Sequence, residues 1–393
     1  ATGTTEVPKR KSTLATAREY AVRILKTDEW RVTLDPDLLE KPLPHLPTGS
    51  MIIDYLIGGQ PNRNGVTPCP GLPRGRVTQL WGHEAAGKTT LALTAAAATC
   101  RAGGSVLYVD WENDIVPDYA SSLGVPIGDP DRFELVQPDT LEDGMKIIKT
   151  YAMAGVDLIV IDSVGAAVPA AIAGRGIEET GEQARVGLAA QRWSEFLPDI
   201  KGVIRKSNTG LLGISQVRAK IGGMGNGPQS EPQGGYAWKF YSALRIELRR
   251  IQAEKAKQVN VLTNKTEERV SGGVILAKVV KCKLSSSQGR EERFYIRQGE
   301  GIDDVRATLE IAAAHHVLRK SGSWINYGEE KWQGMEKVLD HFKSRPDAFA
   351  ELVAKVRPHL TTASSEGPEA EVDEPEPNAL EAYAQEAAEA DVG

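Results

Sequence analysis

The chain has 393 residues, of which 41% are hydrophobic and 25% are charged. This composition is typical of a globular protein, and no apolar run approaches the roughly 20 residues that a membrane span requires. The three cysteines, Cys69, Cys100 and Cys282, have no paired spacing. A disulfide framework or a zinc site is therefore not expected, and the pattern favours a protein of the reducing cytoplasm without membrane contact.

The net charge of −6 is distributed unevenly along the chain. Ten of the 53 acidic residues lie in residues 361–393, which hold no Lys or Arg, so residues 1–360 carry a net charge of about +4. The acidic total therefore does not exclude a nucleic-acid partner. Residues 361–393 are rich in Glu, Ala and Pro, and we expect them to form a disordered acidic tail.

The N-terminal region, residues 1–46, is predicted to hold one helix and a linker. Leu14–Lys26 places its apolar residues along one stripe of a helix, and residues 27–46 are interrupted by prolines. A single amphipathic helix cannot bury its stripe alone. We therefore expect this helix to dock on a neighbouring copy of the chain and to support polymerisation.

From residue 47 to about residue 300, short apolar strands alternate with helical segments. This alternation predicts an α/β fold with a mostly parallel, doubly wound sheet. The predicted parallel strands are rich in β-branched residues, as expected for strands covered on both faces. They are Val77–Trp81, Ser105–Val109, Phe133–Val136, Leu158–Ile161 and Leu211–Ser215.

The second half of the chain is predicted to extend this sheet and then to form a small C-terminal α/β domain, residues 301–360. The antiparallel extension comprises the strands Ala243–Arg249, Val274–Cys282 and Glu292–Arg297. The C-terminal domain is predicted to contain helices near Val305–Arg319, Gly334–Lys343 and Asp347–Val356, with a hairpin at Ser323–Gln333.

The most specific motif is Gly82–Thr89, which reads Gly-His-Glu-Ala-Ala-Gly-Lys-Thr and matches the phosphate-loop pattern G-x-x-x-x-G-K-[ST]. It lies between the strand Val77–Trp81 and the helical run Thr90–Cys100. In such a loop backbone N–H groups surround the nucleotide phosphates, the lysine reaches the β- and γ-phosphates, and the Thr hydroxyl binds Mg²⁺. The predicted nucleotide-binding residues here are Gly82, His83, Glu84, Ala85, Ala86, Gly87, Lys88, Thr89 and Thr90.

Three polar residues follow predicted strands at the edge where the phosphate loop begins. Asp162 ends a buried strand and can hold Mg²⁺ through water, and Glu112 can polarise an attacking water. Gln216 places a neutral amide at the same edge, where it can sense a γ-phosphate. Taken singly, Glu112 and Gln216 are also compatible with ordinary strand ends, and Asp162 with a helix cap.

Beyond the phosphate loop, the chain carries a series of further motifs. They are Asp110 and Glu112 with Pro117 and Tyr119, Gln137–Thr140, Asp162–Ser163, Gly187–Ala190, Gln216–Gly222, Gly234–Gly235 with Lys239–Tyr241, and Val279–Lys283. Over about residues 47–360, these motifs resemble the RecA family of homologous-recombination ATPases, and their order and spacing fit that family better than a generic phosphate-loop ATPase. The insertion Pro61–Pro70 favours a distant member, such as a phage-encoded one.

The resemblance implies a catalytic set. Glu112 matches the catalytic glutamate, and Gln216 matches the γ-phosphate sensor that leads into a DNA-binding loop. Lys281 and Lys283 match lysines that reach the nucleotide of the neighbouring subunit, where they act as an arginine finger does. Lys88 of the phosphate loop completes the implied catalytic set.

The resemblance also implies ATP and Mg²⁺ as cofactors. Tyr119 matches the ring that stacks on adenine. Thr89 would bind the metal directly, and Asp162 would bind it through water.

Two DNA-binding loops are implied at about residues 170–187 and 221–235, which are long, Gly-rich and not periodic. Basic residues there would contact phosphates, apolar residues would wedge between stacked bases, and glycine N–H groups would approach the strand. The implied DNA-binding residues are Arg185, Val186, Ser194, Arg218, Lys220, Ile221, Gly234 and Gly235.

Some positions depart from the family pattern. Gln191 and Pro198 stand where the family usually has arginines, and the first loop is long and acidic. Contacts with DNA are therefore expected to be redistributed, for example onto Arg175, Arg185 or Arg192. Val116 replaces an acidic residue that usually touches the adenine amino group, which leaves base selectivity open.

These features predict a DNA-dependent ATPase that forms helical filaments on single-stranded DNA and catalyses pairing and strand exchange with homologous duplex. One alternative is a hexameric helicase or motor on the same fold, which would form closed rings. A second is a filament-forming regulator that binds single-stranded DNA with little turnover. A small-molecule kinase is disfavoured, because no acceptor pocket or lid signature is evident.

Overall fold

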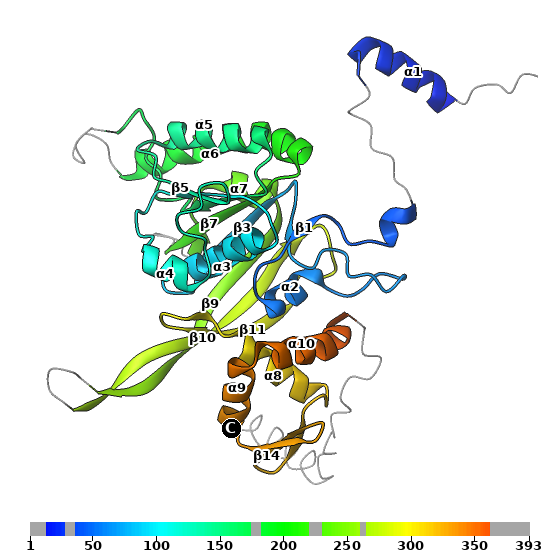
Figure 1. Ribbon diagram of the computed structural model, residues 1–393. Helices are drawn as coiled ribbons and strands as arrows, with labels where there is room; N and C mark the ends of the chain where they lie inside the picture. The colour runs from blue at the N-terminus through cyan, green and yellow to red at the C-terminus, as the bar shows by residue number, and fades with distance from the viewer. Residues whose placement is uncertain (1–12, 28–35, 174–181, 220–229, 260–264, 362–393) are drawn as a thin grey trace, which may run out of the picture.

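The computed structural model describes residues 13–27, 36–173, 182–219, 230–259 and 265–361. Figure 1 shows a central sheet with helices on both faces, a smaller C-terminal unit beside it, and one N-terminal helix, α1 (Thr13–Leu25), standing apart. This helix confirms the one predicted at Leu14–Lys26. It buries none of its residues, and Leu14 and Tyr20 are 77% and 67% exposed.

The central sheet has the strand order β12-β11-β10-β9-β3-β7-β6-β4-β5, and β8 pairs with β7 outside this path. The strands from β9 to β5 run parallel, which confirms the doubly wound prediction. Their bounds are β3 Val77–Gly82, β4 Val106–Asp110, β5 Phe133–Val136, β6 Leu158–Asp162, β7 Gly210–Ala219 and β9 Ser242–Val259.

Helices cover both faces of the parallel strands, so successive residues of one strand enter different cores. Leu107 and Val109 of β4 pack with α5 (Leu141–Ala154), α6 (Glu182–Ser207) and α7 (Tyr236–Tyr241). Val106 and Tyr108 pack on the opposite face with α2 (Met51–Gly58) and α3 (Lys88–Arg101). The sheet edge that carries the strand ends is thereby fixed from both sides.

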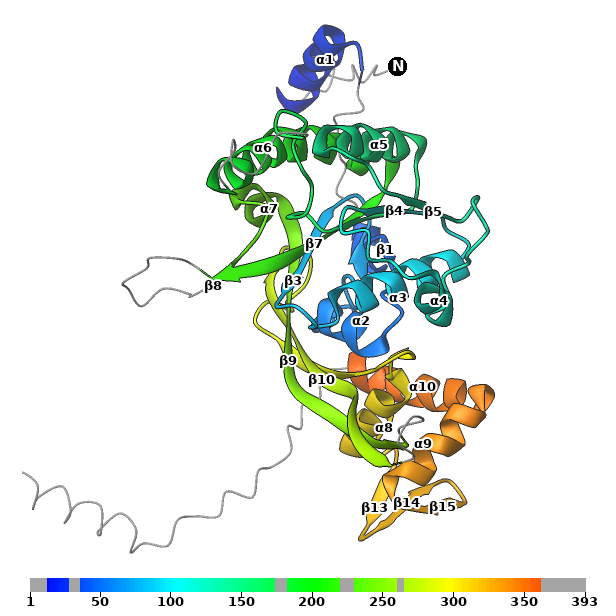
Figure 2. The same ribbon diagram turned by 90° about the vertical axis from the view of Figure 1, so that its left-hand side faces the viewer.

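The antiparallel extension is longer than its sequence predicts. The strand β9 pairs with β3 in parallel along its first half, and its second half forms an arm with β10 (Thr266–Cys282) that projects from the sheet (Figures 1 and 2). The outer half of the arm is polar and exposed, so it lacks the apolar alternation by which strands are detected. The sheet ends with β11 (Glu291–Arg297) and β12 (Gly301–Ile302).

Apart from α2, the described segment before β3 is mostly irregular. It contains a 3₁₀ turn at Pro36–Leu39 and a two-stranded ribbon of β1 (His45–Leu46) with β2 (Leu72–Pro73). The insertion Pro61–Pro70 lies between α2 and β2.

The C-terminal unit differs from its prediction at the end of its first helix and in one additional strand. The helix expected at Val305–Arg319 ends as α8 at Ala314, because the backbone turns at His316 (φ 57°) and buries Leu318 in the core of the unit. The next residues form β13, a third strand beside the predicted hairpin. The remaining elements are β13 Arg319–Ser321, β14 Trp324–Tyr327, β15 Glu330–Gln333, α9 Met335–Ser344 and α10 Pro346–Thr361.

Among the described helices, none is both long and apolar enough to cross a membrane. The predicted acidic tail lies almost wholly outside the described residues.

Candidate active site

The phosphate loop connects the end of β3 to the start of α3 at Lys88. Gly87 precedes the helix with a φ of 80°, a left-handed conformation that glycine adopts without strain. A Cβ at Gly87 would lie 2.2 Å from Cδ1 of Ile296, and one at Gly82 would lie 2.2 Å from the carbonyl oxygen of Leu248. Gly87 is therefore required by its backbone geometry, and Gly82 by the close approach of the β9 backbone.

Lys88 is 7% exposed and lies inside the loop. Its Nζ donates a hydrogen bond of 2.8 Å to the carbonyl oxygen of His83. Burial lowers the pKa of Lys88, while the carboxylates of Asp162, Glu112 and Glu84 oppose that effect. A buried ammonium held within the loop is the group expected to neutralise nucleotide phosphates.

Thr89 and Asp162 form the oxygen-rich corner of the site. Thr89 Oγ1 and the Tyr108 hydroxyl each donate a hydrogen bond of 2.8 Å to Oδ2 of Asp162. Burial raises the pKa of Asp162 to about 6. Hydroxyl and carboxylate oxygens are the donors that Mg²⁺ prefers, so these residues fit the predicted metal site.

Glu112 and Gln216 come from different strands and are in direct contact. Glu112 lies just past β4, whereas Gln216 lies inside β7, opposite Gly82, because β7 extends beyond the predicted end at Ser215. Gln216 Nε2 donates a 2.9 Å hydrogen bond to Oε1 of Glu112, and Ser163 Oγ donates to the same oxygen. Asp110 holds this turn in place, because its Oδ1 accepts the backbone N–H groups of Glu112 (3.0 Å) and Asn113 (2.9 Å). The sequence assigned no site role to Asp110 or Ser163.

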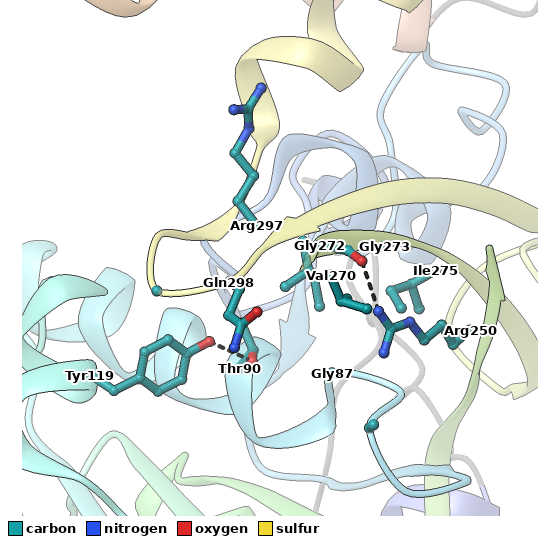
Figure 3. A pocket seen from close by; sticks show the side chains of 13 residues that line it. Gly87, Thr90, Tyr119, Arg250, Val270, Gly272, Gly273, Ile275, Arg297 and Gln298 are labelled. Atoms are coloured by element: carbon teal, nitrogen blue, oxygen red, sulfur yellow. Dashed lines mark hydrogen bonds between the residues drawn. The ribbon is translucent and has the colours of Figure 1, made fainter. Parts of the chain in front are cut away.

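A cavity of about 570 Å³ opens beside the phosphate loop. Tyr119, on α4 (Pro117–Ser122), lines it, and the Tyr119 hydroxyl lies 2.7 Å from Thr90 Oγ1 (Figure 3). Val116 caps α4 and is 57% exposed. The residues of the opposite wall were not predicted from the sequence. They are Arg250, Val270, Gly272, Gly273, Ile275, Ile296, Arg297, Gln298 and Gly299.

Only one sequence signal pointed toward that wall. The pair Gly272–Gly273 lies inside β10, and glycine within a strand often marks the close approach of a ligand or another backbone. A Cβ at Gly272 would lie 2.3 Å from the carbonyl oxygen of Ile296.

Lys281 and Lys283 lie at the end of β10. Lys281 Nζ donates to the carbonyl oxygens of Lys239 (2.7 Å) and Phe240 (3.2 Å) on α7, and burial together with neighbouring Lys283 lowers its pKa. The strand ends at Cys282, so Lys283 lies just past it. These contacts are with α7 rather than the phosphate loop, and the action of both lysines in a neighbouring subunit stays a prediction.

The family model of the RecA N-terminal domain matches residues 40–303, and that of the RecA C-terminal domain matches residues 307–361. The chain belongs to the RecA family. It is similar to the RecA protein of Thermus aquaticus, with 40% identity over 79% of this chain and 84% of the relative. The RecA proteins of Lactiplantibacillus pentosus and Streptomyces ambofaciens are 37% and 36% identical, over 82% and 87% of this chain and 78% and 87% of their own lengths.

Membership of the RecA family places the chain among DNA-dependent ATPases of recombination and repair. It therefore binds nucleotide and DNA. The helicase and low-turnover alternatives are not favoured.

The first of the two DNA loops expected in a RecA protein is shorter than predicted. Residues 182–187 belong to α6 rather than to the loop 170–187, and residues 174–181 lie outside the described structure. Arg185 and Val186 are in the first turns of α6, where Val186 is 48% exposed. Further along this helix, Ser194 is exposed, and its Oγ donates to the carbonyl oxygen of Ala190 at 2.8 Å.

Of the second expected loop, 221–235, the structure describes residues 230–235, which lie beside α6 and α7 (Figure 2). Ser230–Pro232 form β8, which pairs with the end of β7 and brings Glu231 opposite Arg218. Lys220 and Ile221 lie outside the described residues. Gly234 and Gly235 have φ values of 97° and 78°, and a Cβ at Gly235 would lie 2.9 Å from Cβ of Ala190.

Arg192, one of the arginines considered for redistributed DNA contacts, is already paired. Its Nε lies 3.0 Å from Oε1 of Glu142, and its Nη1 lies 3.0 Å from Oε2 of Glu195. Gln191 also donates to Glu195, at 3.1 Å. The two carboxylates leave less positive charge on this face of α6 for a phosphate. Arg175 lies outside the described residues.

Proposed function

We propose that this chain hydrolyses ATP with Mg²⁺ while it assembles as a helical filament on single-stranded DNA, and that it exchanges strands with homologous duplex in the cytoplasm. The observation that carries the proposal is the hydrogen bond between Glu112 and Gln216. It joins the residue placed to activate water with the strand β7, which continues into the DNA-facing ribbon. This one hydrogen bond thus connects the nucleotide site with the strand that leads to the DNA side.

ATP would lie with its phosphates on Gly82–Thr89 and its base against Tyr119. Lys88 would neutralise the β- and γ-phosphates. Thr89 and Asp162 would hold Mg²⁺, which neutralises charge on the phosphates when bound. Glu112, which is half-buried, would polarise the attacking water as a general base.

Gln216 would act as the link between nucleotide state and DNA binding. Its amide donates to Glu112 here, and a γ-phosphate near Glu112 offers a competing acceptor for that N–H group. A change of partner at Gln216 would move the end of β7 and the ribbon it forms with β8. ATP would thereby favour the DNA-binding state, and hydrolysis would release DNA.

Self-association would complete the site. The exposed apolar stripe of α1 supports packing of this helix on a neighbouring subunit. Lys281 and Lys283 would then be delivered to the neighbour's nucleotide, where cations stabilise transition-state charge.

The DNA side would hold the backbone and stacked bases of a single strand, and base pairing would supply sequence recognition. Arg185, Val186 and Ser194 on α6 and Gly234 and Gly235 before α7 support this placement, since α6 and α7 pack side by side. Arg218, Lys220 and Ile221 would extend the surface from the end of β7.

The test is electron microscopy with single-stranded DNA and a slowly hydrolysed ATP analogue, paired with a strand-exchange assay. We expect open helical filaments and exchange. Closed rings without exchange would favour a motor, and filaments with exchange but no phosphate release would favour a regulator.

The variant Lys88→Ala tests the ATP site in the same assays. Loss of the buried ammonium removes charge neutralisation at the phosphates, so ATP turnover should fall below detection. Phosphate release measured with and without DNA checks this expectation. Turnover at the wild-type rate would refute the assignment of the phosphate loop.

A further inference from the structure

One end of the nucleotide cavity is built by α4 and by the turn between β11 and β12. Tyr119 comes from α4, and Gln298 and Gly299 come from the turn (Figure 3). The phosphate-loop residues Ala85 and Gly87 line the same cavity. With phosphates on the loop, the space between Tyr119 and Gln298 is the place for a nucleobase.

The backbone around Gln298 is held on both sides. Its N–H donates to the carbonyl oxygen of Ser271 at 2.9 Å. The next carbonyl, that of Gly299, accepts a 3.1 Å hydrogen bond from Ser122 Oγ. Ser122 lies on α4 with Tyr119, so the turn and the aromatic ring are tied to each other.

Other polar side chains around this end already have partners. The Tyr119 hydroxyl is hydrogen-bonded to Thr90, Arg250 Nη2 donates to the carbonyl oxygen of Gly272 at 2.7 Å, and Arg297 Nε donates to Asp303 at 2.6 Å. Val116 is aliphatic, and its side chain can neither donate nor accept a hydrogen bond. Within the described part of the chain, the Gln298 carboxamide makes no hydrogen bond of its own, although it lines the cavity.

We propose that Gln298 reads the N6 and N7 edge of the adenine base and so selects ATP over GTP. The proposal rests on the ATP site proposed above and names its base-specificity residue. A carboxamide offers one acceptor and two donors, so its oxygen accepts from the adenine N6 amino group while its NH₂ donates to N7. Guanine presents two acceptors at that edge, O6 and N7, which leaves the carboxamide oxygen without a donor.

The test measures nucleotide affinity without DNA, by displacement of a fluorescent ribose-labelled ATP with ATP, GTP and 7-deaza-ATP. The variants are Gln298→Leu, which keeps the side-chain size but cannot hydrogen-bond, and Gln298→Arg, whose paired donors match guanine O6 and N7. Gln333→Arg, on exposed β15, controls for added charge. Melting temperatures check that each variant is folded.

We expect the wild type to prefer ATP over GTP by about 10-fold or more, and to lose a similar factor with 7-deaza-ATP, which lacks the N7 acceptor. Gln298→Leu should bind the three nucleotides about equally, by weakening ATP and not by strengthening the others. Gln298→Arg should reverse the preference toward GTP, and Gln333→Arg should behave as the wild type.

Equal affinities in the wild type, or an unchanged ATP preference in Gln298→Leu, would overturn the proposal. Insensitivity of the wild type to 7-deaza-ATP, or an ATP preference that survives in Gln298→Arg, would overturn the assignment to the N6 and N7 edge. Strand exchange does not enter this readout. A protein that discriminates between bases through Gln298 yet exchanges no strands would contradict the proposed function and leave this inference standing.

Discussion

Glu112 shows how much of the site depends on residues that do no chemistry. Its position follows from Asp110, which is 1% exposed and accepts the backbone N–H groups of the turn. Its orientation follows from Ser163 and Gln216, which donate to the same oxygen. The spacing of Asp110 and Glu112 was visible in the sequence. The contact of Glu112 with Ser163 and Gln216, which come from two other strands, was not.

The first prediction at this scale concerns Glu112→Gln. The amide keeps the size of the side chain but cannot take a proton from water, so turnover should fall by about 100-fold to 10,000-fold. Nucleotide binding should be retained, because Lys88, Thr89 and Asp162 are unchanged. Phosphate release and a nucleotide titration measure the two effects.

The control for this variant is Glu336→Gln, an exposed carboxylate on α9. It should leave turnover unchanged. If Glu112→Gln also turned over at the wild-type rate, another group would have to activate the water.

At the scale of elements, α6 and α7 are positioned by an aromatic core. Trp193 on α6 and Trp238 on α7 are fully buried, with ring centroids 5.2 Å apart. Trp238 packs directly over Gly213 of β7, where a Cβ would lie 2.3 Å from the indole ring. A missing side chain on β7 thus sets how closely α7 approaches the sheet.

Gly213→Ala should therefore destabilise the fold. The added methyl group overpacks the contact with Trp238, and we expect a cost of about 1–3 kcal/mol in the free energy of unfolding. Urea unfolding followed by tryptophan fluorescence measures it.

A matched glycine on α6 provides the opposite expectation. A Cβ at Gly202 would meet nothing within 4 Å, so Gly202→Ala should stabilise the helix by about 0.5–1 kcal/mol. Equal effects of the two substitutions would show that the close packing at Gly213 does not affect the free energy of unfolding.

At the scale of the whole molecule, a pair of carboxylates lies where the core meets the C-terminal unit. Asp304 of α8 accepts Ser50 Oγ (2.6 Å) and the backbone N–H of Met51 (2.8 Å), while Asp54 of α2 accepts Thr48 Oγ1 at 2.7 Å. Burial raises the pKa of Asp54 to about 7, and the charge of nearby Asp304 adds to that effect while Arg357 opposes it. The junction therefore carries a group that titrates near neutral pH.

The pH dependence at this junction has a definite sign. A carboxyl whose folded-state pKa is about 7, against an ordinary value of 3.8, stabilises the fold fully at low pH and loses that contribution as pH rises through 7. Asp54→Asn cannot ionise, and its amide oxygen can still accept from Thr48. From about pH 5.5 to about pH 8, the melting temperature of the wild type should fall relative to that of the variant. Parallel melting curves across this range would contradict the assignment.

Assembly is the other property of the whole molecule. The double variant Lys281→Ala with Lys283→Ala should lose DNA-stimulated hydrolysis by about 1,000-fold or more, because cations delivered by a neighbour act only in the filament. Nucleotide binding by the isolated subunit should be largely retained. Phosphate release with DNA and a nucleotide titration without DNA separate these effects.

Lys255→Ala with Lys257→Ala is the matched control, since these exposed lysines also alternate along one strand. It should keep DNA-stimulated hydrolysis. A loss of nucleotide binding in the Lys281 and Lys283 variant would instead place those lysines in their own subunit's site or indicate a folding defect.

The sequence by itself determined the parallel core, the phosphate loop and the polar residues Asp162, Glu112 and Gln216 at or near the ends of their strands. These features depend on local periodicity and on short motifs, which are written in neighbouring residues. Only the tertiary structure decided where α8 ends, how far the arm of β9 and β10 extends, and which residues form the wall opposite Tyr119. Those outcomes depend on contacts between segments far apart in the chain, as when Ser122 holds the turn at Gly299 and brings Gln298 beside the nucleotide site.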